Sequence, residues 1–203
     1  NAATILCPNA AVGDSGVSNG VVYTKRDRAG LLALVGAANE AELATSCTSG
    51  VTDMSAMFNG ASTFNVNIAS WDTSSVTTMK DMFKGALAFD QDISKWTTAT
   101  VTDMQSMFNG ATSFNKDISG WSTVEVTDMI STFNGATSFN QDLSSWNVAK
   151  VTSTCANFDA NAGAAWVQPK PSLPRSCLRF SLSANLVTIL CPNAAVGEKG
   201  VVN

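Results

Sequence analysis

Large apolar residues recur along the middle of the sequence with a period of 25 residues. Residues 101–125 read VTDMQSMFNGATSFNKDISGWSTVE, and residues 126–150 read VTDMISTFNGATSFNQDLSSWNVAK. The register holds without insertion from residue 51 to residue 158. Such a period predicts stacked coils, because every coil of a stack has the same interior to fill. We expect one continuous core from the repeated positions, which include Val51, Phe58, Phe64, Trp71, Val76, Phe83, Phe89, Trp96, Val101, Phe108, Phe114, Trp121, Val126, Phe133, Phe139 and Trp146.

The first half of each coil has a helical spacing. Apolar residues of the first coil stand at i, i+3, i+6 and i+7, which predicts a short helix turned inward, at Val51, Met54, Met57 and Phe58. Thr52 or Asp53 can cap its first turn, and Gly60 stands where a helix end favours positive φ.

The second half of each coil is expected to be extended. Phe64, Ile68 and Trp71 are predicted to point inward, with a short strand between them that pairs with the next coil. The expected fold class is an α/β repeat solenoid, in which each coil holds a short helix, a glycine turn and a short parallel strand.

The flanking segments lack the 25-residue period and are predicted to be caps. Residues 1–50 indicate an N-terminal cap with a hairpin turn at Asn19-Gly20, a strand through Tyr23 and a helix from about Asp27, followed by a second short helix.

The rest of the chain divides into three parts. Residues 51–160 hold four full coils and one terminal coil, and residues 161–184 form a C-terminal cap or linker. Three prolines exclude a helix interior from that linker: Pro169, Pro171 and Pro174. Residues 185–203 repeat residues 1–19 at a displacement of 184, with 14 of 19 positions identical. We expect this chain to be one unit of a tandem array, followed by the start of the next unit.

The cysteines follow the same longer period. One unit holds Cys7, Cys47, Cys155 and Cys177, and Cys191 corresponds to Cys7. Cys47 and Cys155 lie about four coil spacings apart, roughly 19 Å at ~4.8 Å per stacked strand, which is too far for a disulfide. The favoured pairs are therefore Cys7 with Cys47 and Cys155 with Cys177, which leaves Cys191 unpaired. The alternative is a clamp between Cys177 and Cys191, and metal binding ranks third because the chain lacks both CxxC and histidine.

Composition excludes several function classes. The net charge of -4 disfavours nucleic acid and anionic membrane surfaces as partners. No apolar run reaches the ~20 residues of a membrane span. The absence of histidine excludes Ser-His-Asp and Cys-His catalysis, and no P-loop or dinucleotide fingerprint occurs. We therefore expect no catalytic residue, cofactor or metal site, and no enzyme. An even number of cysteines per unit favours two disulfides and an oxidising compartment.

Repeated carboxylates are the one feature that resembles a site. They form two series: Asp92, Asp117 and Asp142, and Asp53, Asp103 and Asp128. We interpret them as turn caps, because an aspartate that caps a turn in one coil does so in all. Ca²⁺ held between neighbouring coils is the second interpretation, and an acidic catalytic groove is the third.

The repeat pattern V-T-[DT]-M-x-x-M-F-x-G-A-x-x-F-N-x-[DN]-I-S-x-W resembles the BspA-like leucine-rich repeats, also described as a domain of unknown function in mycoplasma surface lipoproteins and found in secreted microbial and algal proteins. The resemblance covers about residues 51–158. It implies a right-handed solenoid at a cell surface, in long repetitive proteins linked to adhesion. Thr154, Cys155 and Asn157 depart from the pattern, as expected where the last coil meets a cap.

Three functions follow as expectations. The first is a structural or adhesive extracellular protein, in which tandem units join head to tail into a rod or filament at the cell surface. There, the TILCPNAAVG segment of the next unit would cover part of the open end of the stack. The second is a module that binds a glycan or a cell-surface protein. The third is ice binding, suggested by the threonine ladder from Thr52 to Thr152, although the ladder Thr73, Thr98, Thr123 ends at Val148.

Overall fold

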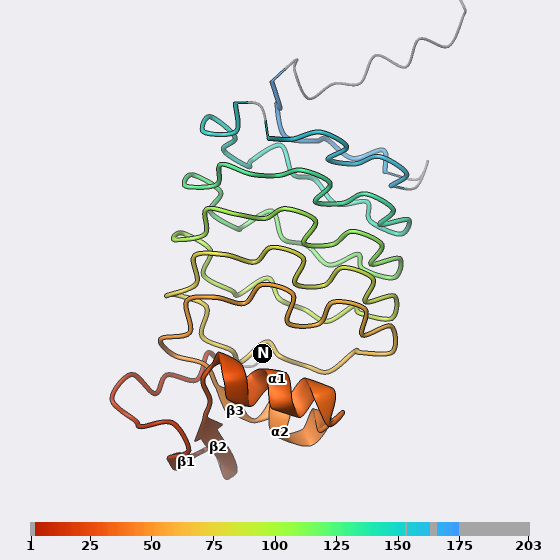
Figure 1. Cartoon of the computed structure of the whole chain (residues 1–203). Coiled ribbons are helices and arrows are strands. Elements are labelled where there is room, and N and C mark those ends of the chain that lie inside the picture. The colour runs from red at the N-terminus through yellow and green to blue at the C-terminus, as the bar shows by residue number, and fades with distance from the viewer. Residues whose placement is uncertain (1–2, 153, 163–165, 175–203) are drawn as a thin grey trace, which may run out of the picture.

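The chain winds into a stack of similar coils with a small cap at its N-terminal end (Figure 1). The computed structural model describes residues 3–152, 154–162 and 166–174. We name the coils by their residues: first coil 51–75, second 76–100, third 101–125, fourth 126–150, and a terminal coil from 151. This arrangement is that of a repeat solenoid.

The cap contains all the helices and named strands of the described residues: β1 (Ser15–Ser18), β2 (Val21–Lys25), α1 (Arg28–Gly36), α2 (Glu40–Ala44) and β3 (Ser46–Cys47). β1 and β2 form an antiparallel hairpin, and β2 also pairs in parallel with β3. Asn19 and Gly20 both have positive φ, as a two-residue hairpin turn requires. The predicted hairpin and helices of the cap are confirmed.

Side-chain caps begin both helices. Asp27 accepts a hydrogen bond of 2.8 Å from the backbone N–H of Gly30, and Asn39 accepts one from Glu42. Leu31 and Leu43 are buried and belong to the same apolar core as the coils. The helices therefore cover the first coil, whose apolar face would otherwise meet water.

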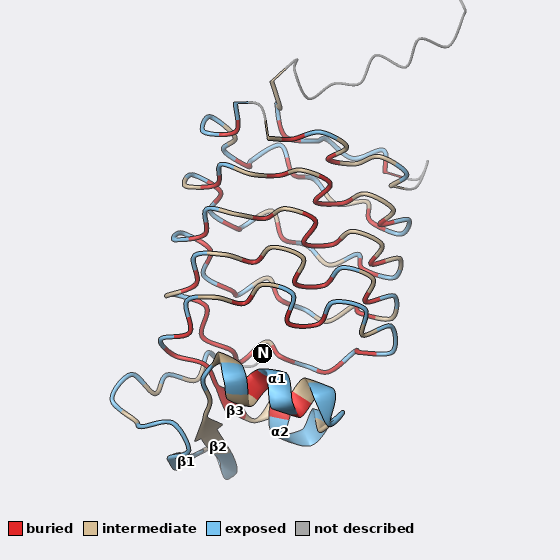
Figure 2. Cartoon of the chain, viewed as in Figure 1, coloured by how far each residue is buried: buried red, intermediate tan, exposed pale blue. Residues whose placement is uncertain are grey.

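Aromatic ladders fill the stack. The rings of Phe83 and Phe108 stack with centroids 5.6 Å apart, and those of Trp96 and Trp121 with centroids 6.3 Å apart. Every repeated core position named from the sequence is buried, and Figure 2 shows burial recurring at equivalent places in successive coils. The regular spacing of buried rings is what the 25-residue period encodes.

The predicted short helix in each coil is wrong. Met54, Phe58 and Gly60 donate their backbone N–H groups to carbonyls of the next coil, at Thr78, Met82 and Lys84, rather than four residues back. Ala56 has a φ of 53°, which a helix does not contain. The same left-handed conformation recurs at Asp81, Ser106 and Ser131. A chain of turns thus gives the same inward spacing as a helix.

The predicted strand between Phe64 and Trp71 is wrong as well. Isolated parallel bridges instead join the starts of the coils, linking Asp53 to Thr78, Thr78 to Asp103, and Asp103 to Asp128. The predicted glycine turn is present, since Gly60 has a φ of 75°. Its counterpart Gly85 stacks on it so closely that an added Cβ would lie 3.6 Å from the Gly60 Cα.

The proline-containing segment lies against the far end of the stack. Pro169 accepts a hydrogen bond of 2.9 Å from the Leu143 N–H, and Trp166 packs edge-on against Phe139 with centroids 4.8 Å apart. Residues of the terminal coil are shifted by one place, because the N–H of Phe133 donates to Phe158, 25 residues on, rather than 24. The regular ladder therefore changes at this end.

Candidate functional site

The first series of repeated carboxylates caps turns. Asp92, Asp117 and Asp142 each accept a hydrogen bond of 2.9–3.0 Å from the backbone N–H two residues on. The hydroxyl and N–H of Ser94 lower the pKa of Asp92, and the N–H and hydroxyl of Ser119 do so for Asp117. These carboxylates are engaged by their own turns and face no unrepeated partner.

The second series does the same work at the starts of the coils. Asp53, Asp103 and Asp128 accept hydrogen bonds of 2.7–2.9 Å from the N–H two residues on. In the second coil, the Thr78 hydroxyl takes this acceptor role. Burial raises the pKa of Asp103, and the nearby carboxylates of Asp128 and Asp81 add to that rise. The positions thus require a short acceptor rather than a charge.

Neither series forms a metal site. Within the part of the chain that the structure describes, no group of three or more Asp, Glu, Cys or His side chains could hold a metal ion. The ladder spacing explains this result, because each carboxylate oxygen turns toward its own backbone. Ca²⁺ therefore has no preformed cluster among these residues.

Threonine forms two ladders with different surroundings. The outer ladder is exposed, and the hydroxyls of Thr77, Thr102 and Thr127 donate to the carbonyl of the preceding ladder residue at 3.1–3.2 Å. The inner ladder is buried, and the hydroxyls of Thr73, Thr98 and Thr123 donate to the next coil at 2.9 Å. Only the outer ladder can meet a ligand or ice.

An outer amide ladder was missed by our sequence analysis. Asn65, Asp90, Asn115 and Asn140 occupy one repeat position, and each Oδ1 accepts from the backbone N–H of its successor or, at the end, of Val167, at 2.8–3.0 Å. Lys116 adds an ion pair of 2.7 Å to Asp90. The available signal was a polar residue directly after each second Phe of the repeat.

The N-terminal segment, which we define as residues 4–13, is tied to the cap and the first coil. Cys7 forms a disulfide with Cys47, and its N–H donates to the Ser49 hydroxyl at 3.0 Å. Lys25 donates its ammonium to the Cys7 carbonyl at 3.3 Å, and the Ile5 N–H donates to the Ser70 carbonyl at 2.9 Å. We call the receiving residues Lys25, Cys47, Ser49 and Ser70 the seat.

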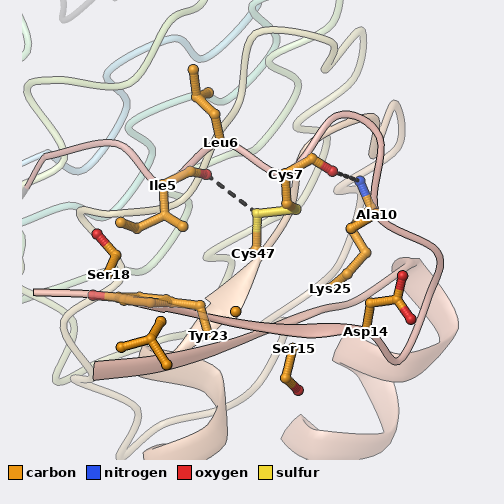
Figure 3. A pocket seen from close by; sticks show the side chains of 12 residues that line it. Ile5, Leu6, Cys7, Ala10, Asp14, Ser15, Ser18, Tyr23, Lys25 and Cys47 are labelled. Carbon is orange, nitrogen blue, oxygen red and sulfur yellow. Dashed lines mark hydrogen bonds between the residues drawn. A yellow bond between two sulfur atoms is a disulfide. The ribbon is translucent and has the colours of Figure 1, made fainter. Parts of the chain in front are cut away.

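Packing between this segment and the hairpin is incomplete. A cavity of about 200 Å³ lies between them, and Figure 3 shows Ile5 and Leu6 on one side of it and Tyr23 on the other. Leu6 and Val17, which also line it, are 67% and 71% exposed. The segment is therefore held more by the disulfide and hydrogen bonds than by burial.

The seat is electrostatically connected to the first coil. Asp72 accepts a hydrogen bond of 2.5 Å from the Ser49 hydroxyl. Burial acts to raise the pKa of Asp72, but hydrogen bonds from Ser49 and Ser74 and the charge of Lys25 outweigh it and lower the pKa. Cys155, at the other end, is buried and disulfide-bonded. Its expected partner Cys177 and the alternative Cys191 lie outside the described residues.

A family model described as "Mycoplasma protein of unknown function, DUF285" matches residues 33–129 and again residues 94–164. The chain belongs to this family. The two matches overlap over the third coil, as expected when a family model slides along an exact repeat. No curated protein and no solved structure matches the chain. The DUF285 matches leave out the N-terminal segment and half of the seat, namely Lys25 and Cys7 with its surroundings, so this anchoring lies partly beyond the family's repeat.

Proposed function

We propose that this DUF285 protein is a structural or adhesive repeat protein of the cell surface, one unit of a tandem array that builds a rod or filament. The observation that carries the proposal is the use of the repeated side chains. Rings stack inside, while Thr, Asn and Asp side chains tie each coil to its neighbour outside. Such a molecule is built to be stiff rather than to react.

The sequence echo at a displacement of 184 residues supports the tandem arrangement. Repeat proteins need their end coils covered, and an array can share such covers between neighbours. Here α1 and α2 cover the first coil, and the segment around Trp166 lies on the fourth. Each unit thus has distinct ends, which favours head-to-tail order.

A location outside the cell is part of the proposal. The Cys7–Cys47 disulfide is typical of proteins in oxidising compartments. None of the helices in the described ranges is long and apolar enough to cross a membrane. The family assignment also extends, in our proposal, to the BspA-like leucine-rich repeats and their right-handed coil, which the 25-residue motif supports.

An enzymatic role has little support. The chain lacks histidine, and both carboxylate series are engaged in turns. A second candidate is a module that binds glycan or protein, favoured by the exposed outer ladder of Thr77, Thr102 and Thr127. Ice binding by that ladder ranks below it, because Lys84, Lys116 and Gln91 also stand on the exterior.

The test is to isolate the native assembly under non-reducing conditions and image it by electron microscopy. We expect rods or filaments with a repeat along their axis. A monodisperse single unit would contradict the proposal, and binding on a glycan array would then favour the second candidate. Thermal hysteresis in cold solution would identify ice binding.

A further inference from the structure

The N-terminal segment has an exact copy elsewhere in the chain. Residues 188–197 read TILCPNAAVG, and so do residues 4–13. The flanking positions differ in part, so the identity is concentrated on the stretch that reaches the seat. A peptide identical to a bound segment can make the same contacts wherever the same seat is offered.

The seat recognises features that both copies share. It binds the N–H of Ile5 and both backbone groups of Cys7, and it bonds covalently to the Cys7 sulfur. Farther along, the Gly13 N–H donates to the Lys25 carbonyl at 2.9 Å. The corresponding residues of the copy are Ile189, Cys191 and Gly197.

The segment now in the seat is weakly packed. None of residues 4–13 is buried, and Leu6 and Val12 are 67% and 59% exposed. The hydrophobic contribution to holding it is therefore small, and the disulfide is its main attachment. Because the segment precedes the cap rather than forming part of the core, its exchange leaves the coils intact.

We propose that residues 188–197 of one copy occupy the seat of a second copy, in place of that copy's residues 4–13. This deepens the proposed function, on which it rests for the head-to-tail order of units, and it names the partner as a second copy of this chain. The tail of one unit then lies against the first coil of the next. Our sequence-based expectation placed TILCPNAAVG over the last coil, whereas the structure places its twin at the first.

The covalent step is a thiol–disulfide exchange. In the pairing favoured by the sequence, Cys191 carries a free thiol. Its thiolate attacks the sulfur of Cys47 in the second copy, the Cys7–Cys47 bond breaks, and Cys7 leaves as a thiolate that takes up the proton released by Cys191. One disulfide replaces another, so no oxidant is consumed.

The resident segment competes, because it is tethered at high effective concentration. The test therefore uses the full chain with Cys7→Ala and Cys191→Ala, which leaves the Cys47 thiol in an uncontested seat. The probe is a synthetic peptide of residues 185–200, added in a glutathione redox buffer in which glutathione disulfide is the oxidant. Capture is measured by intact mass and peptide mapping.

We expect capture at Cys47 at least tenfold faster than for a scrambled peptide that keeps its cysteine in place. Adding Ser49→Ala should slow capture several-fold, because the peptide loses the acceptor for its cysteine N–H. Equal capture of both peptides would show that Cys47 is merely reactive and would overturn the proposal. The unaltered chain provides a second measurement without a folding risk, since the natural peptide should displace Cys7 faster than the scrambled one does.

The second copy is identified with mixed isotopes. Chains carrying only Cys7→Ala are prepared with ¹⁴N and with ¹⁵N, mixed under reducing conditions and oxidised with glutathione disulfide. Peptides linking Cys47 to Cys191 should include pairs of one light and one heavy strand. Same-isotope pairs alone would place the link within one chain and refute exchange between copies. Capture without rods in the micrographs would reject the proposed function alone, and rods without capture would reject this inference alone.

Discussion

The indole N–H of Trp121 donates a hydrogen bond of 3.1 Å to the carbonyl oxygen of Ile93, which belongs to the preceding coil. The same bond joins Trp96 to Ile68 and Trp146 to Ile118. Each indole thus stacks on its neighbours and also satisfies a buried carbonyl between coils. The tryptophan ladder is both packing and hydrogen bonding, which makes its two contributions separable by mutation.

Trp121→Ala should destabilise the protein by about 3–5 kcal/mol, because it opens a large cavity between two coils. Trp121→Phe keeps most of the stacking but leaves the Ile93 carbonyl without its donor, which we expect to cost about 1–3 kcal/mol. Urea unfolding followed by circular dichroism measures both. Val124→Ala is the control, since that side chain is 42% exposed and its loss should change stability by less than about 0.5 kcal/mol. Equal effects of the phenylalanine and control variants would exclude a structural role for the indole N–H.

Thr98→Val should destabilise the stack by about 1–3 kcal/mol, because the buried Ser122 carbonyl loses its donor while the side-chain volume is kept. The matched control is Thr77→Val on the outer ladder, where water can replace the lost bond to Thr52. The control should cost less than half as much in the same urea titration. A larger effect at Thr77 would contradict the assignment of inner and outer ladders.

The repeat could be predicted from the sequence because its signal is redundant. Each of the rings at Phe83, Phe108 and Phe133 occurs at the same place in its coil, so one register error would have disturbed all of them. The cap was also predictable, since Asn19-Gly20 and Asp27 are local signals that need no distant partner.

The local structure of each coil was not predictable in the same way. Met54, Met57 and Phe58 point inward in a helix and also in the observed turns, so their spacing cannot distinguish the two. The choice depends on the N–H of Met54, which bonds to Thr78 in the next coil. Such a bond links residues 24 apart and leaves no trace in a short window of sequence. The seat was missed for the same reason, because Lys25, Ser49 and Ser70 are brought together only by folding.

Asp92→Asn and Asp103→Asn should change stability with opposite signs at pH 7. Both variants keep an oxygen acceptor, and Asn67 naturally occupies the Asp92 position in the first coil. Hydrogen bonds from Ser94 lower the pKa of Asp92 in the folded state, so its carboxylate stabilises the fold above pH ~4. Burial raises the pKa of Asp103, so its carboxylate opposes folding at pH 7.

Unfolding free energies between pH 7 and pH 3 test this difference. The stability that Asp92 contributes should be lost as the pH falls below about 4 and through its lowered folded-state pKa, which brings Asp92→Asn and wild type together. The advantage of Asp103→Asn should shrink as the pH falls through the raised pKa of Asp103 toward the unfolded value. Parallel pH profiles for wild type and both variants would contradict these assignments.

Reduction of the Cys7–Cys47 disulfide should release the N-terminal segment without opening the coils. In the oxidised protein, the amide hydrogens of Ile5 and Cys7 are protected because they bond to Ser70 and Ser49. After reduction we expect both to exchange near the unprotected rate, since no residue of the segment is buried. The amides of Phe83 and Phe108 should keep their protection, because their bonds lie within the stack. The double variant Cys7→Ala/Cys47→Ala separates this effect from any change at Cys155, and hydrogen exchange measured by mass spectrometry should give the same pattern for it. Loss of protection throughout the coils would show instead that the disulfide holds the whole stack together.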